Sequence, residues 1–490
     1  MNKTKFLTGF PKHLFGSAKR KTQDSIRLDA EKSLNESLGG FAAQFSRFIP
    51  ATLLPGLSQN KRKRVFTDEI TFWAWMSQVL DFNASCSAAL SRVQAWRLEA
   101  KLGPISSKTT AYCNARKRLG MDFIRSVSNH LVKLLNQRVQ SQQLWHGQVV
   151  MSVDGSSAQL MDTEENQAEF PQPSNQKKNC GFPVMKFLGL LNHCTGAWEH
   201  HLTAHPDEHD ARTMKRLINY FTEPCILLAD RAFCSFEIML RLKQRGVESV
   251  MRLHQMRARG FTLRKGKRIG KNERLVTWIK PKYKPKHSDL TDEEWAALDE
   301  TIEMRLIACW YEDRNGEKKR MILATTLLDT VKYDWLDLAN LYATRWDIEL
   351  RIRDVKTTMQ MEALNVKTPE MAKKSMAMAL LGYNLIKAIS QEASMATGED
   401  LRIISFKGVL DWVNSTTELF LSASRKSARA IAQLYEQFLE TASEKLIDVR
   451  PYRWEPRAKK KRPKPFPRLM ESRGSLKERR DKGELIPALS

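Results

Sequence analysis

The sequence predicts an α/β protein in which a mixed sheet is flanked in the chain by helical regions. Residues 149–153 and 225–229 form short apolar runs, and an aspartate follows each of them. The second run is followed by a helical pattern over 235–245 and by a further apolar run at 247–251. A strand, a helix and a strand at this spacing indicate a parallel pair of strands within a mixed sheet.

The N-terminal part is predicted to be a basic arm over residues 1–66 followed by a helical domain over 67–145. The arm ends in the run QNKRKR. In the helical domain, patterns over 86–101 and 108–120 are separated by Gly103-Pro104. A helix, a turn and a basic helix fit a helix-turn-helix, the commonest DNA-binding pair of helices. Most short helical pairs bind no DNA, so a plain helical pair is the alternative.

Residues 146–369 carry the predicted sheet together with an insertion. Additional strands are expected at 182–191 and 198–203, where β-branched, aromatic and other apolar residues gather. Residues 252–333 are a β-rich insertion with runs such as MRLIACWY and RMILATTL. Two further segments follow: a helical region over 370–448 and a basic, proline-rich tail over 449–490, whose composition is typical of chain that packs no core of its own.

The charge balance indicates a polyanionic partner. Lysine and arginine number 80 against 55 acidic residues, which gives a formal net charge of +25. Cations that neutralise phosphates release counterions, so nucleic acid is the simplest such partner, although ribosomal and membrane-surface proteins share this charge. The seven cysteines are scattered without a C-x-x-C pair, which favours a reducing cytoplasm. No apolar run is long enough to predict a membrane span.

Residues 341–356 place four unlike polar side chains on one side of a single predicted helix. At about 100° per residue, Tyr342, Arg345, Glu349 and Lys356 fall within a stripe of about 60°, beside an apolar and therefore buried face. This arrangement suits a metal ion held by Glu349 next to a phosphate backbone held by Arg345 and Lys356. The alternative is a solvated face with ordinary ion pairs four residues apart.

Three carboxylates then form a candidate metal site. Asp154 and Asp230 are predicted at the ends of strands, where ligands bind in open α/β sheets, and Glu349 lies in the later helix. Clustered carboxylate oxygens suit Mg²⁺ or Mn²⁺, and two such ions together promote phosphodiester chemistry. Each aspartate taken alone has a simpler explanation as a turn or helix-capping residue. The three together, beside a basic stripe, favour the metal site.

These residues resemble the hallmark of a known family, the DDE transposases of bacterial insertion sequences, in the group typified by insertion sequence four. The group carries Tyr, two residues, Arg, three residues, Glu, six residues and Lys, and the stripe at 341–356 matches it without a gap. Asp154 in SVDGS and Asp230 in LADRAF match its two acidic positions. TAYCNARKRL and KRPKPFP also resemble family segments, so the resemblance covers about residues 67–470.

The resemblance implies an RNase H-like catalytic core with a β-rich insertion between the second aspartate and the glutamate. It implies that Asp154, Asp230 and Glu349 hold two Mg²⁺ or Mn²⁺ ions. Water would first nick the transposon end, and the freed 3′-hydroxyl would then attack a phosphodiester. Tyr342 and Arg345, with Lys356, would contact DNA phosphates near the cleaved end.

One position departs from the pattern of the relatives that form DNA hairpins. Those relatives stack a flipped base on a tryptophan in the insertion, shortly before the glutamate helix. The corresponding residue here is Met321 in KKRMILATT. The candidate base-stacking residues are therefore Met321 itself and, in the preceding strand, Trp310 or Tyr311. The resemblance does not decide whether this protein forms a hairpin.

The prediction is thus a transposase, an enzyme that binds the terminal inverted repeats of its own element and cuts and joins DNA by a DDE two-metal mechanism. Expected partners are double-stranded repeat and target DNA and a second copy of the chain on paired ends, with no membrane. The expected location is the bacterial cytoplasm, on the nucleoid when bound to DNA. The alternatives are another RNase H-fold nuclease and a non-catalytic DNA-binding regulator of transposition.

Overall fold

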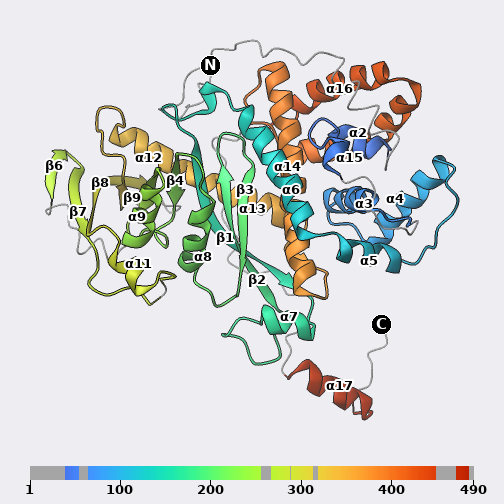
Figure 1. Cartoon of the computed structure of the whole chain (residues 1–490), viewed down its shortest axis with the longest axis horizontal. Coiled ribbons are helices and arrows are strands. Elements are labelled where there is room, and N and C mark those ends of the chain that lie inside the picture. The colour runs from blue at the N-terminus through green and yellow to red at the C-terminus, as the bar shows by residue number, and fades with distance from the viewer. Residues whose placement is uncertain are drawn as a thin grey trace.

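A mixed ten-stranded sheet and a large group of helices make up the two halves of the molecule (Figure 1). The computed structural model describes residues 39–54, 64–254, 266–286, 288–312, 318–447 and 471–484. The α/β class predicted from the sequence is confirmed.

The central part of the sheet has the strand order β3-β2-β1-β4-β5. Strand β2 runs antiparallel to β1, whereas β4 and β5 run parallel to it. A short strand, β10, also pairs with β1 in parallel. The bounds of these strands are β1 Val150–Leu160, β2 Val184–Asn192, β3 Trp198–Ala204, β4 Cys225–Ala229, β5 Val247–Arg252 and β10 Ala363–Leu364.

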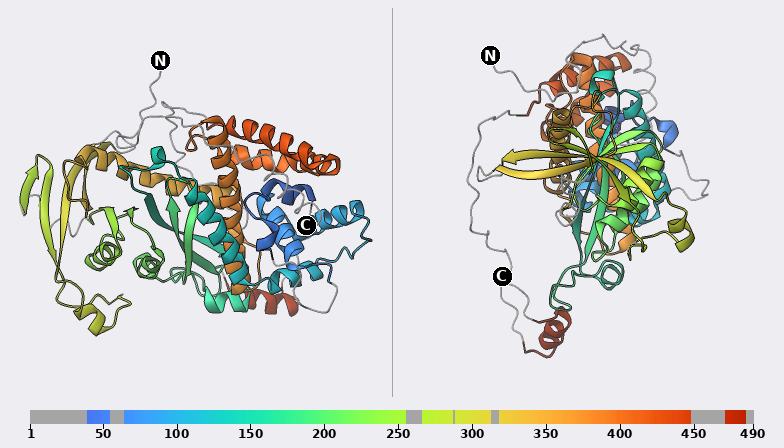
Figure 2. Two further views of the ribbon diagram at one scale, coloured as in Figure 1. Left: turned by 45° about the horizontal axis from the view of Figure 1, so that its top comes forward. Right: turned by 90° about the vertical axis from the view of Figure 1, so that its left-hand side faces the viewer.

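The segment between β5 and the next long helix extends the same sheet. Strand β9 pairs antiparallel with β5, and the order continues through β8, β7 and β6. The two views of Figure 2 show these strands continuing the sheet away from the helical half of the molecule. The elements are β6 Lys267–Gly270, β7 Glu273–Ile279, α11 Asp292–Ala296, β8 Thr301–Glu312 and β9 Lys318–Thr325.

Helices cover both faces of the sheet, and the alternation of strand side chains assigns residues to each face. Leu227 and Ala229 of β4 pack with helices α8 and α9 in one apolar cluster. Ile226 and Leu228 pack on the opposite face with helix α12 in another cluster. The bounds are α8 Asp210–Leu217, the 3₁₀ turn Ile218–Tyr220, α9 Phe236–Gln244 and α12 Trp335–Ala343.

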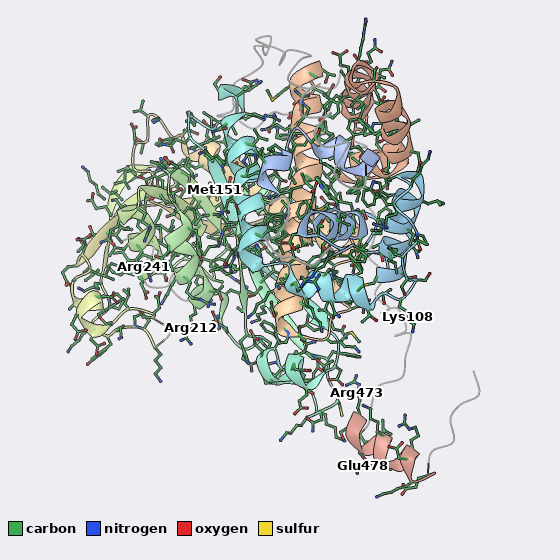
Figure 3. All side chains as sticks on the ribbon, turned by 45° about the vertical axis from the view of Figure 1, so that its right-hand side comes forward. Lys108, Met151, Arg212, Arg241, Arg473 and Glu478 are labelled. Atoms are coloured by element: carbon green, nitrogen blue, oxygen red, sulfur yellow. The ribbon has the colours of Figure 1, made fainter. Side chains whose placement is uncertain are left out.

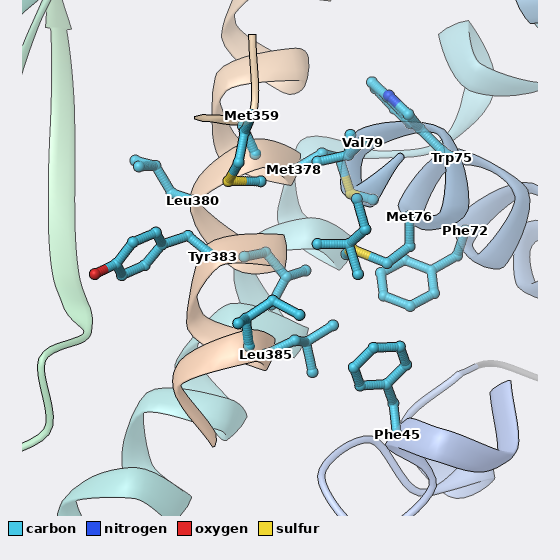
Figure 4. Packing of buried hydrophobic residues seen from close by; sticks show 14 of the residues in the cluster. Phe45, Phe72, Trp75, Met76, Val79, Met359, Met378, Leu380, Tyr383 and Leu385 are labelled. Atoms are coloured by element: carbon cyan, nitrogen blue, oxygen red, sulfur yellow. The ribbon is translucent and has the colours of Figure 1, made fainter. Parts of the chain in front are cut away.

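The helices of the two ends of the chain share one hydrophobic core. Helix α14 lies at its centre and packs against α3, whose Phe72 and Met76 are labelled in Figure 4, while its Tyr383 points away from α3 and contacts the rings of Trp198 and Phe406. The N-terminal elements are α2 Gly39–Phe45, α3 Asp68–Leu80, α4 Cys86–Glu99, α5 Thr110–Arg118 and α6 Met121–Gln137, with 3₁₀ turns Ala51–Leu53 and Ser141–Gln143; the C-terminal ones are α14 Pro369–Thr397, α15 Phe406–Lys426 and α16 Ala428–Ser443.

Helix α14 shows how the sequence sets an element's ends. The Thr368 side chain accepts a hydrogen bond from the Met371 N–H, and Pro369 occupies the first turn, where no N–H is needed. Gly398 ends the helix at φ 84°, a left-handed conformation that costs little without a Cβ. The 29 residues between these signals give a helix long enough to contact both groups of shorter helices.

The predicted N-terminal arm over 1–66 is partly integrated into this core. Phe41, Phe45 and Phe48 are buried, and α2 packs against α15. Residues 1–38 and 55–63 lie outside the described residues, as do 448–470 and 485–490 of the predicted tail.

Two further helices lie at the lower end of the molecule in Figure 1. Helix α7 Glu164–Glu169 belongs to the α7 arm, our name for the β1–β2 connection at 161–183. Helix α17 Arg473–Asp481, from the C-terminal tail, lies beside this arm. In Figure 3, Arg473 marks its first turn and Glu478 its far half. Among the helices of the described chain, none is long and apolar enough to cross a membrane.

The single helix predicted over 341–356 is wrong. The segment begins in α12, tightens to a 3₁₀ turn at Thr344–Trp346, continues as α13 Asp347–Arg353 and widens to a π-helical turn at Asp354–Thr358. The 3₁₀ and π turns are both right-handed and continue the coil of the α-helix, so the spacing of apolar residues along the sequence looks like that of one helix. Only the backbone hydrogen bonds differ, which change from i+3 to i+4 to i+5 along the segment. π-turns of this kind are frequent at functional sites.

Candidate active site

Asp154 lies inside strand β1 and not at its end. The strand continues to Leu160 because β2 keeps pairing with it, and Asp154 itself is opposite Gly189. The parallel pairing of β1 with β4, in contrast, ends just before Asp154, with the pair Ser152 and Leu228. Val150 packs in the cluster under α12, and Asp154, four residues further along the same strand, points to the same face of the sheet. The Asp154 carboxylate therefore lies on the face that α12 and α13 cover.

The environment of Asp154 makes its carboxyl group unusually basic. Burial raises the pKa of Asp154 to about 6. The Gly155 N–H, which donates to Asp154 Oδ1 at 2.8 Å, and Arg345 both oppose this rise. The negative charges of Glu349 and Asp230 add to it. Glu349 and Asp230 are therefore each close enough to repel the Asp154 carboxylate.

Asp230 directly follows β4, as the sequence predicts, and a cation stands beside it. Ala229 pairs with Met251 of the parallel neighbour β5, so the next residues, Asp230 and Arg252, come at the same edge of the sheet. The positive charge of Arg252 acts on Tyr342, as does the negative charge of Asp230. Arg252 is not among the residues predicted for the site, although the parallel alignment of the apolar runs 225–229 and 247–251 puts it next to Asp230.

Arg345 joins the strand acids to the helix acid. Its Nη1 lies 3.8 Å from Asp154 Oδ2, and its Nη2 lies 3.4 Å from Glu349 Oε1. The side chain of Arg345 is buried, whereas that of Glu349 is 43% exposed. One guanidinium thus balances two carboxylates from β1 and α13, which is the planar, two-sided pairing that favours arginine over lysine.

Two aromatic side chains flank this guanidinium. Its central carbon lies 6.0 Å from the ring centre of Tyr342 and 4.8 Å from that of Trp346. Burial raises the pKa of Tyr342 to about 12, so the phenol is neutral at physiological pH. Trp346 is 54% exposed, which makes it an apolar surface beside the charged site. Trp346 directly follows Arg345 in the sequence and is not among the four residues of the stripe at 341–356.

Lys356 lies in the π-helical turn that follows α13. Its backbone carbonyl accepts a hydrogen bond from the Glu362 N–H, and its side chain is half-buried. The change to i+5 bonding alters the direction of this side chain from the one that a regular α-helix would give. The structure therefore brings Tyr342, Arg345 and Glu349 together with the two aspartates and sets Lys356 on a separate turn.

The three carboxylates fit a divalent cation by their chemistry. They supply hard oxygen ligands, and their mutual repulsion at Asp154 is what a bound cation would relieve. In the described part of the chain, no three His, Cys, Asp or Glu side chains are grouped closely enough to form a finished metal site. The guanidinium of Arg345 stands between two of them instead.

The three candidate base-stacking residues do not share one environment. Met321 of β9 is opposite Cys309 and packs against the cluster on the α12 face, which is the face of the carboxylates. Trp310 is 64% exposed and neighbours Cys309 in the strand, so it points to the other face. Tyr311 pairs with Lys319 in the ladder.

The predicted helix-turn-helix corresponds to α4 and α5. One of the three cations that end α5 is internal: Arg116 lies 4.3 Å from the Trp75 ring and 3.2 Å from Cys86 Sγ. Lys117 and Arg118 are exposed. Lys108, before α5, is exposed too and lies at the outer edge of the helical half in Figure 3. A basic surface therefore accompanies the predicted pair.

Sequence comparison identifies the class to which this site belongs. Residues 145–385 match the family model of the transposase DDE domain, a span that contains both aspartates, Glu349 and the sheet that carries them. The chain belongs to the DDE transposases, of the IS4 type.

Individual relatives are similar over part or most of the chain. The transposase InsG for insertion sequence element IS4 of Escherichia coli K12 is 26% identical over 290 residues, which cover 57% of this chain and 60% of that protein. A cryo-EM structure of the piggyBac transposase synaptic complex with hairpin DNA aligns with a TM-score of 0.40 and 10% identity, covering 87% of this chain and 86% of that one.

Proposed function

We propose that the protein cuts and joins DNA at the ends of its own insertion sequence in a reaction that requires a divalent metal. The observation that carries this proposal is the convergence of Asp154 on β1, Asp230 after β4 and Glu349 on α13, with the guanidinium of Arg345 between Asp154 and Glu349. The composition supports a polyanionic substrate, because a net charge of +25 favours DNA.

The core is, on this proposal, RNase H-like. Two features support this. The strand order is β3-β2-β1-β4-β5, in which β2 runs antiparallel to β1 while β4 and β5 run parallel to it, and helices cover both faces of the sheet. The catalytic domain would span 146–369 with its insertion at 252–333. The helical regions at 67–145 and 370–448 share one hydrophobic core. We therefore propose them as regions with different functions and not as separately folded domains.

Asp154, Asp230 and Glu349 would hold Mg²⁺ or Mn²⁺, two ions per site, which when bound would supply Lewis acidity for phosphodiester chemistry. Arg345 neutralises carboxylate charge and is placed to stabilise negative charge on a phosphate near the cleaved end. The neutral Tyr342 hydroxyl is available as a hydrogen-bond donor beside it, and Lys356 would contact a neighbouring phosphate. Met321 is the base-stacking candidate on the same face.

The partners follow from the same proposal. Residues 67–145, with the basic surface beside α5, would bind the terminal inverted repeat, and the catalytic domain would bind the cleaved end and the target. A homodimer on paired ends is proposed from the family resemblance. The proposed location is the bacterial cytoplasm, with association to the nucleoid through DNA.

A cleavage assay on linear DNA that carries the sequences flanking the gene tests this proposal. Mg²⁺ is compared with Ca²⁺, and the native protein with Glu349→Gln and with the control Glu362→Gln, an exposed glutamate beyond the π-turn. We expect Mg²⁺-dependent nicking at the element's ends in the native protein and the control, and none in Glu349→Gln. Cleavage of arbitrary DNA would indicate a general nuclease, and binding without cleavage in all three proteins would indicate a regulator.

A further inference from the structure

A buried histidine connects the two elements that carry the first and third carboxylates. His193 lies in the turn between β2 and β3, and its Nε2 is 2.6 Å from Ser152 Oγ on β1. Its Nδ1 is 4.0 Å from Asp347 Oδ2 on α13. Ser152 precedes Asp154 by two residues, and Asp347 precedes Glu349 by two.

The period of each element makes this bridge relevant to the carboxylates. Residues two apart on a strand lie on the same face, so Ser152 and Asp154 point toward the same side of the sheet. On a helix, residues two apart lie within one turn but about 200° apart around the axis, so Asp347 and Glu349 share a turn of α13 and point to different sides of it. The link from Ser152 through His193 toward Asp347 therefore joins the strand that carries Asp154 to the turn of α13 that carries Glu349.

The environment of His193 defines its hydrogen-bonding state. Its side chain is 10% exposed, and burial, together with the nearby charge of Arg351, lowers its pKa to about 4. A neutral imidazole has one N–H and one acceptor nitrogen. A carboxylate 4.0 Å from Nδ1 favours the tautomer with the proton on Nδ1, in which Nε2 accepts the hydrogen bond from the Ser152 hydroxyl.

The turn that carries His193 is itself fixed to the sheet. The His193 N–H donates to the Val150 carbonyl at 2.9 Å, and the Cys194 N–H donates to Asn192 Oδ1 at 2.8 Å. Arg351 of α13 acts on His193 by its charge, and its Nη1 is 3.5 Å from Asp354 Oδ2 in the turn that continues the helix. The ring is thus a spacer between a rigid strand and a short helix.

We propose that His193 is a positioning residue that holds α13 at the distance from β1 at which Asp154 and Glu349 act on the same cation. This inference rests on the proposed function for the cation and on the contacts of His193 for the spacing. Residues that orient ligands in this way typically alter metal affinity or activity 10–100-fold when replaced.

Four variants test it. His193→Ala removes the ring, Ser152→Ala removes only the hydroxyl, and His193→Gln restores an amide that can accept from Ser152 and donate toward Asp347. His201→Ala is the matched control, since His201 is a partly buried histidine on β3, a strand that pairs with β2 and is separated from β1 by it. The readouts are Mn²⁺ binding by calorimetry, hydrogen exchange of the α13 amides, and the kcat and KM of end cleavage.

We expect His193→Ala to weaken Mn²⁺ binding roughly tenfold and to lower kcat roughly 10–100-fold, with KM for DNA within about twofold. Exchange over 347–353 should accelerate, because the helix loses its tie to the sheet. Ser152→Ala should show smaller changes in the same direction, and His193→Gln should recover most of the loss.

Equal losses in His193→Ala and His201→Ala, or no recovery in His193→Gln, would show a merely structural role and overturn the inference. Unchanged exchange of α13 in His193→Ala would overturn it whatever the protein does to DNA. If the native protein bound no Mn²⁺, the proposed metal chemistry would fail, and the exchange data alone would decide whether His193 sets the position of α13.

Discussion

Replacing Lys387 by methionine is expected to stabilise the protein, most strongly at acidic pH. Lys387 lies in the middle of α14 and is 1% exposed, and Gly196 faces it so closely that a Cβ there would lie 2.7 Å from Lys387 Cε. Burial, reinforced by Arg351, lowers the pKa of Lys387 to about 7 against the partial compensation of Asp354. Asp354 keeps Arg351 as a partner in the variant, so no carboxylate is left alone.

The size of the effect follows from the two protonation states. Between pH 7 and 10.5 the unfolded chain binds a proton on Lys387 that the folded chain does not bind. The free energy of unfolding of the native protein therefore rises with pH in this window by up to about 1.4 kcal/mol per pH unit. Below pH 7 the folded protein carries the full destabilisation, roughly 5 kcal/mol. From pH 6 to pH 9 the advantage of Lys387→Met should fall by roughly 3 kcal/mol.

Urea unfolding followed by circular dichroism at pH 6 and pH 9 measures this difference. The control is Lys374→Met on the same helix, whose ammonium is buried too but pairs with Glu370 and donates to the Lys117 carbonyl at 2.8 Å. The control should lose stability at both pH values, because it leaves polar partners unpaired. An advantage of Lys387→Met that is equal at pH 6 and pH 9 would refute the reasoning.

Three further changes have expected outcomes. Arg345→Ala should raise the pKa of Asp154 above its value of about 6, because the guanidinium opposes the rise; carboxyl-carbon NMR titration would show it, and an unchanged titration would contradict the pairing. Trp145→Ala, at a fully buried position, should cost about 3–5 kcal/mol in thermal unfolding, against less than about 0.5 for the 82% exposed Leu98→Ala. Arg473→Ala should make residues 471–484 more sensitive to limited proteolysis, because it removes the contact of α17 with the α7 arm, and equal cleavage rates would argue against that contact.

The strands of the core were predictable because each is a short apolar run. The runs at 225–229 and 247–251 became β4 and β5, and Asp230 follows β4 as predicted. The end of β1 was placed too early, because a polar stretch, DGSSAQ, continues as strand when a neighbour pairs with it. Pairing partners are tertiary information, which a single-sequence pattern lacks.

The sequence predicted which residues belong to the candidate site, but not how their side chains are arranged. Tyr342, Arg345 and Glu349 lie together, as the predicted stripe requires: the Arg345 guanidinium lies near the Tyr342 ring and near the Glu349 carboxylate. The stripe did not hold for Lys356, because an apolar period cannot distinguish i+4 from i+5 bonding. His193 left no signal, since a single histidine in a turn has no pattern.

The core shared by both ends of the chain has a consequence for how the protein is made. Helix α3 ends at Leu80 and α14, which covers it, begins at Pro369, about 290 residues later. At about 5–20 residues per second, a ribosome needs roughly 15 to 60 s to add that length. During this interval the aromatic face of α3 has been synthesised without its cover, so the nascent chain depends on chaperones or on transient packing within its own N-terminal helices. A message cut short before α14 would yield a polypeptide with this face exposed and would favour its degradation over its accumulation.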